Sequence, residues 1–278
     1  MKPIIMQGVI KPRYLPDTNR ISMLAATILL AYALARFVNL PIRELAIQLP
    51  GLYLNVQINV RTFVALLVAG LTAAGADWLL RDHPAFKGKS TIEHWLLPAL
   101  TALVIGLPLF QLPLGPLWWG GFALGGGLLM LVLVAEYISV DPEDVRQPPA
   151  AAGLTAVSFA LYLALAVALR FAELRLFLIL PALTLAVFLV SLRALNLRLR
   201  GQWAFIPAGV VALITGQIVA ALHYWPLAPV PYGLALLGPA YALTSLIAGL
   251  VEGEPLRQAL VEPGVVLVLV WGAALWIR

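Results

Sequence analysis

Nine apolar stretches, each about as long as a membrane-spanning helix, follow one another along the chain. A helix needs about 20 residues to cross the hydrocarbon core of a bilayer. Short segments that carry most of the charged residues separate these stretches. The predicted spans are residues 21–38, 61–80, 94–112, 117–137, 152–170, 175–195, 203–223, 232–250 and 260–277.

The composition agrees with lipid as the main solvent. Of the 278 residues, 62% are hydrophobic and only 11% are charged, whereas about 25% of residues are charged in soluble domains. We therefore predict an all-α integral membrane protein, a polytopic bundle of about nine transmembrane helices, within a range of eight to ten. The two least regular spans are 232–250, which Gly238 and Pro239 interrupt, and 260–277, which carries Glu262 and Pro263 near its start.

Lysine and arginine predict how the chain is oriented, because cytoplasmic loops carry an excess of them. With the N-terminus inside, twelve lie on the cytoplasmic side and six on the other side. We expect residues 1–20 to form a cytoplasmic basic arm and residues 21–278 to form a single transmembrane domain. The location that fits this pattern is a bacterial-type plasma (inner) membrane.

The longest outside connection, residues 40–60, is more than a polar loop. Ile42, Leu45 and Leu49 share one helical face, and apolar and polar residues alternate between Leu52 and Val60. This pattern predicts one or two helical turns followed by a strand. Because no second strand is evident on that side, we expect an extracytoplasmic interfacial segment that lies flat on the headgroups, with pairing to a partner chain as the alternative.

A second polar segment, residues 75–95, is the most chemically varied in the chain. Asp77 lies four residues before Arg81 at the end of a predicted span, so the two side chains can neutralise each other. Glu93 and His94 open the next span, where the helix dipole favours a carboxylate and Thr91 is available as a cap. On this interpretation the segment is two helix ends and the loop that joins them.

The alternative interpretation is a site at the cytoplasmic face. Asp77, Glu93 and His94 would then be catalytic candidates, and His83 and His94 would be candidate metal ligands. The spacing matches no metal-binding motif, so we expect the structural interpretation and no bound metal.

Glycines in the fourth span predict close helix packing. The sequence GGFALGGG places Gly121 and Gly125 four residues apart, which is the small-residue spacing that lets membrane helices approach closely. No strand precedes this segment and no lysine follows it, so a phosphate-binding loop is excluded.

Several classes of protein are excluded by residues that the sequence lacks. It has no cysteine for thiolate ligands and only three histidines, which argues against a multi-haem protein. No predicted span contains a lysine that could bind retinal. The basic residues lie scattered at span ends, which favours the bilayer over nucleic acid as the partner. We expect no cofactor and no nucleic-acid partner.

Three functions remain. The first is a non-catalytic accessory or scaffold component, which the scarcity of polar residues inside the spans favours. The second is a carrier for a small or lipid-like substrate, which proline-broken helices at 98–113 and 226–239 would support. The third is a membrane enzyme that acts at the cytoplasmic headgroup level through Asp77 and His94. The expected partners are the lipid bilayer and either another membrane subunit or further copies of the chain.

The predicted orientation can be tested by labelling. Because the chain has no cysteine, Ser90→Cys and Gln57→Cys each introduce a single reactive thiol. An impermeant thiol reagent should label these two variants from opposite sides of the membrane. Labelling from the same side would contradict the orientation.

Overall fold

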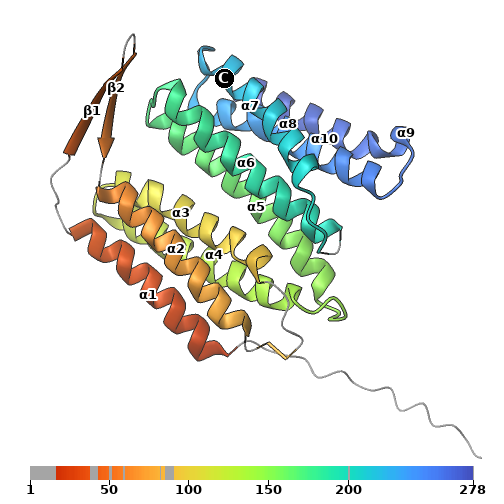
Figure 1. The fold of residues 1–278 in the computed structure, drawn as a ribbon, viewed down its shortest axis with the longest axis horizontal. Helices are drawn as coiled ribbons and strands as arrows, with labels where there is room; N and C mark the ends of the chain where they lie inside the picture. The colour runs from red at the N-terminus through yellow and green to blue at the C-terminus, as the bar shows by residue number, and fades with distance from the viewer. Residues whose placement is uncertain are drawn as a thin grey trace, which may run out of the picture.

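A computed structural model describes residues 17–37, 43–49, 52–58, 60–81, 83–84, 91–199 and 201–277. These residues form an all-α bundle of long helices joined by short connections, together with one β-hairpin (Figure 1). The elements are α1 (Thr18–Phe37), β1 (Arg43–Leu49), β2 (Leu52–Ile58), α2 (Val60–Arg81), η1 (Ile92–His94), α3 (Leu96–Gln111), α4 (Pro116–Ser139), α5 (Gln147–Phe171), α6 (Leu176–Arg198), α7 (Phe205–His223), α8 (Pro229–Val251), α9 (Leu256–Ala259) and α10 (Val261–Trp276).

Eight helical segments in the described residues are long and apolar enough to cross a membrane, which confirms the predicted helical membrane class. They are α2 to α8 and the segment Leu256–Trp276, which contains α9 and α10. The first helix, α1, has 20 residues, and its apolar part, Thr18–Leu34, is shorter than the other spans. The basic arm predicted at residues 1–20 lies mostly outside the described residues.

Consecutive long helices run in opposite directions (Figure 1). The C-terminal ends of α2, α4, α6 and α8 therefore lie at one end of the bundle, which we call the α2–α3 end. Two large apolar cores fill most of the bundle, and a smaller third cluster includes Leu195 in α6 and Ala208 in α7. One includes Ile28 and Leu133 in α1–α4, and the other includes Val187 and Leu236 in α3–α8. Because α3 and α4 contribute to both cores, these two helices form the seam between them.

The span predicted to be interrupted at Gly238 and Pro239 is one continuous helix, α8. Proline has no backbone N–H, so Pro239 deprives the carbonyl of Ala235 of its helical donor. The indole Nε1 of Trp271 in α10 donates to that carbonyl at 3.2 Å. Membrane helices tolerate proline where a neighbouring helix satisfies the freed backbone group in this way. The helix therefore continues through the proline.

The strands β1 and β2 pair antiparallel, so the helical turn predicted before Pro50 is wrong. The register pairs Leu45 with Val56, Ile47 with Leu54 and Leu49 with Leu52. The helical interpretation used the spacing of Ile42, Leu45 and Leu49. It overlooked the alternation of apolar residues at 45, 47 and 49, which is the period of a strand. A second strand was therefore present in the sequence and is the pairing partner of the first.

Glycines of α4 lie at two different helix contacts. A Cβ atom on Gly125 would lie 2.5 Å from Cγ2 of Ile105 in α3, and one on Gly126 would lie 2.7 Å from Leu29 in α1. A Cβ on Gly121 would lie 3.6 Å from Leu109, which is an ordinary contact distance. The close approach of α3 and α4 therefore depends on Gly125 more than on Gly121.

We predict that Gly125→Ala lowers the free energy of unfolding by about 1–3 kcal/mol, the range for overpacked cores. The physical reason is the contact with Ile105. Gly127→Ala is the matched control, because nothing lies within 4 Å of a Cβ at that position. Thermal unfolding in lipid nanodiscs would measure both variants, and equal stability of the two would contradict the packing role.

Candidate functional site

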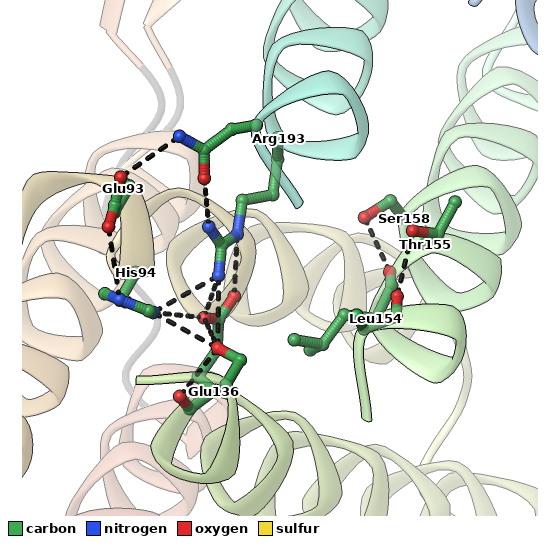
Figure 2. A network of polar contacts seen from close by, with 10 residues as sticks. Glu93, His94, Glu136, Leu154, Thr155, Ser158 and Arg193 are labelled. Atoms are coloured by element: carbon green, nitrogen blue, oxygen red, sulfur yellow. Dashed lines mark hydrogen bonds and ion pairs between the residues drawn. The ribbon is translucent and has the colours of Figure 1, made fainter. Parts of the chain in front are cut away.

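A buried cluster of charged and polar side chains lies at the α2–α3 end of the bundle (Figure 2). It is assembled from three parts of the chain that are far apart in sequence. Glu93 and His94 come from η1, Glu136 from α4, and Arg193 and Asn196 from α6. We call these five residues the polar ring.

The central contact of the polar ring is an ion pair between α4 and α6. Arg193 donates from Nε to Oε1 of Glu136 at 3.1 Å and from Nη2 to Oε2 of the same carboxylate. The side chains are 2% and 1% exposed. Two parallel N–H···O bonds between a guanidinium and a carboxylate are among the strongest contacts that side chains make. This geometry fixes α6 against α4.

Two further hydrogen bonds and the contacts of His94 close the ring (Figure 2). Arg193 Nη1 donates to Asn196 Oδ1 at 2.7 Å, and Asn196 Nδ2 donates to Glu93 Oε2 at 3.0 Å. His94 lies between the two carboxylates, with Nδ1 2.8 Å from Glu136 Oε2 and Nε2 3.5 Å from Glu93 Oε1. An ionised carboxylate can only accept a hydrogen bond, so Nδ1 carries the hydrogen toward Glu136. Each member thus contacts the next one around the ring.

The polar ring lies just inside one end of the spans. Glu136 is three residues before the end of α4 and Arg193 is five residues before the end of α6. At 1.5 Å per residue these positions are about 5 and 8 Å from the helix ends. Buried apolar residues of both cores, including Val132 and Leu133 in α4, lie in the preceding turn. The ion pair is therefore shielded from water. Removing one partner would leave a buried charge that water cannot compensate.

Asp77 makes different contacts from those of the ring. Its carboxylate lies 2.8 Å from Nε of Arg81, which confirms the predicted pair four residues apart. The hydroxyl of Thr91 also donates to Asp77, and Thr91 makes no side-chain cap bond to η1. The predicted capping role of Thr91 is therefore wrong. The contacts of Asp77 go to Arg81 and Thr91, whereas those of His94 go to the ring.

His83 lies buried just after α2, with its ring edge-on to Tyr137 at 4.4 Å between centroids. Burial lowers the pKa of His83, while the carboxylates of Asp141 and Asp144 act in the opposite direction. Within the described part of the chain, no group of three or more histidines, aspartates or glutamates could hold a metal ion. The candidate metal ligands His83 and His94 therefore have no third ligand of these types among those residues.

Sequence reasoning found two members of the polar ring and missed three. It singled out Glu93 and His94 and overlooked Glu136, Arg193 and Asn196. A signal was available, because Glu136 and Arg193 lie inside the predicted spans 117–137 and 175–195. Charged residues within a membrane span are rare and pair with one another, so these two were candidates for a mutual contact.

The opposite end of the bundle holds a partly buried arginine. Arg170 donates to three backbone carbonyls, of His223, Trp225 and Leu227. Its guanidinium also lies 5.0 Å from the ring centroid of Tyr232. These contacts tie the end of α5 to the connection between α7 and α8, which is a structural use of the charge.

Comparison with known proteins gives one match. A family model described as "Protein of unknown function (DUF5656)" matches residues 40–277, a range that includes the polar ring and every described helix except α1. No curated protein and no solved structure matches the chain. The match therefore gives the chain a family and attributes no activity to the ring.

We predict that the two partners of the central ion pair depend on each other. Glu136→Leu or Arg193→Met alone should lower the free energy of unfolding by about 3–5 kcal/mol, because each leaves a buried charge without its partner. The double variant should lose less than either single variant. As a control, Asp77→Asn with Arg81→Gln should cost about 0.3–0.5 kcal/mol, since the Arg81 side chain is 69% exposed.

A double-variant cycle measured by thermal unfolding in nanodiscs would test this coupling. Strictly additive losses from the two single variants would contradict it.

Proposed function

The chain belongs to the DUF5656 family, and we propose that it is a non-catalytic component of a membrane assembly, either a scaffold or an accessory subunit. We place it in the plasma (inner) membrane with its N-terminus in the cytoplasm. The polar ring then lies at the cytoplasmic ends of α3, α4 and α6. One observation carries the proposal, which is that the charged groups of the polar ring satisfy one another.

The closure of the ring supports a structural role. A catalytic acid, base or nucleophile has to reach a substrate, but Glu136 and Arg193 direct their charged atoms at each other and are almost completely buried. Glu93 is the most exposed carboxylate of the ring, at 24%, and it accepts from Asn196. Each of these contacts joins separate helical segments, so the ring acts as a clamp.

The continuity of the helices also favours this proposal over a carrier. The carrier hypothesis rested on helices broken by proline at 98–113 and 226–239. Residues 96–111 form the single helix α3 with Pro108 inside it, and Pro239 lies inside the unbroken α8. The third hypothesis is an enzyme that uses Asp77 together with His94. It is less favoured because Asp77 contacts Arg81 whereas His94 contacts Glu136, so the two side chains do not act on one another.

Isolation of the intact assembly would test the proposal. The tagged full-length chain would be extracted from its native membranes in lipid-preserving polymer discs, and its mass would be measured by native mass spectrometry. We expect a defined complex with another membrane chain. The double variant Glu136→Leu with Arg193→Met should retain that complex. A scaffold needs α4 and α6 to stay packed together, and two apolar side chains can keep this packing without the ion pair.

The opposite result would be a chain without a protein partner whose transport or catalytic activity disappears in the folded double variant. That result would replace the proposal with the carrier or the enzyme. The variant Asp77→Asn with Arg81→Gln controls for general effects of charge removal at the same end of the bundle.

A further inference from the structure

Four buried hydroxyls near the end of the bundle opposite the polar ring have no hydrogen-bond partner among the described residues. They come from four consecutive helices, and each lies within about 14 Å of that end when measured along its helix. The four are Tyr162 in α5, Thr184 in α6, Thr215 in α7 and Tyr232 in α8. Buried polar groups in folded proteins are almost always hydrogen-bonded, so these exceptions call for an explanation.

The two tyrosines need an external partner more than the two threonines do. A threonine in a helix can turn its hydroxyl to the carbonyl four residues earlier, as Thr101 and Thr244 do. A tyrosine hydroxyl stands at the end of a rigid ring, and the side chains of Tyr162 and Tyr232 are 0% exposed. Packing therefore fixes where these two hydroxyls point, and a hydroxyl that is buried without a partner is costly.

Tyr162 and Tyr232 are neighbours across the contact between α5 and α8. They directly precede Leu163 and Gly233, where the two helices lie close together. A Cβ atom on Gly233 would lie 2.7 Å from Cγ2 of Val167 and 2.9 Å from Cδ1 of Leu163. The two phenol groups are near enough to interact electrostatically, yet neither hydroxyl bonds to the other or to another described residue. The pair is therefore a place where two polar groups face one apolar core without bonding directly.

We propose that Tyr162 and Tyr232 bind an internal water molecule between α5 and α8. Water can donate to one hydroxyl and accept from the other, and buried waters in proteins typically serve polar groups that have no other partner. A charged ligand fits less well, because Arg170, which lies against the Tyr232 ring, already donates from Nε, Nη1 and Nη2 to backbone carbonyls. This site does not depend on the scaffold function.

Removal of a single hydroxyl distinguishes a hydrated tyrosine from an unsatisfied one by the sign of the effect. Tyr162→Phe and Tyr232→Phe keep the ring and delete only the polar group. If the hydroxyl had no partner, its deletion would raise the Tm, because a costly buried polar group would be gone. We expect instead that each variant lowers the Tm in lipid nanodiscs by about 2–4 °C, the shift that the loss of one hydrogen bond produces in a chain of this size.

The double variant tests whether the two hydroxyls share one water. Tyr162→Phe with Tyr232→Phe should lower the Tm by less than the sum of the single variants, because the loss of either hydroxyl already weakens the binding of the same water. Tyr32→Phe is the matched control, since the buried hydroxyl of Tyr32 donates directly to the carbonyl of Ala102. Its effect on the Tm should add to that of Tyr162→Phe.

Solid-state NMR of the unaltered full-length chain in lipid bilayers would detect the water itself. Magnetisation should pass from water to the hydroxyl-bearing ring carbons of Tyr162 and Tyr232, which the two phenylalanine variants assign, and not to that of Tyr32. Three results would overturn the proposal. They are a higher Tm in either phenylalanine variant, strictly additive losses in the double variant, and no transfer from water to the two tyrosines.

Discussion

The contact between Arg193 and Glu136 constrains the arrangement of the bundle more than any other interaction described here. A guanidinium and a carboxylate can lie this deep only when each neutralises the other and its remaining polar atoms have partners. Asn196, Glu93 and His94 supply those partners, and they come from two separate segments. The positions of α4, α6 and the start of α3 are therefore coupled, and a shift of any one of them would expose a charge to a low dielectric.

The requirement that a polar group away from water has a partner also applies to backbone carbonyls in the helices. In lipid every carbonyl that loses its helical donor needs another one. Trp271 supplies a donor to Ala235 four residues before Pro239, and Trp118 supplies one to Leu109 in the last turn of α3, where the helix ends. Tryptophans near the ends of these spans therefore have a second role besides anchoring at the headgroups. Each one also joins its helix to the helix that contains the carbonyl without a helical donor.

The sequence predicted what depends on neighbours in the chain. Apolar stretches of sufficient length located the spans, because the requirement to fill the bilayer acts on each helix separately. The pair Asp77 and Arg81 followed from helical spacing. By contrast, Arg193 and Glu136 are 57 residues apart, and their contact depends on which helices pack together. The hairpin was missed for a different reason, since one spacing of apolar residues fitted both a helix and a strand.

Two glutamates show how α6 serves carboxylates at different depths of the bundle. Glu136 points into the bundle, where Arg193 and His94 satisfy it from the same chain. Glu262 is exposed at the start of α10, where Tyr241 of α8 donates one hydrogen bond and Arg198 of α6 interacts with it electrostatically. The buried carboxylate needs a direct ion pair because water cannot reach it, whereas the exposed one is served by a hydrogen bond and a more distant cation. Two arginines of one helix, Arg193 and Arg198, thus meet two different requirements.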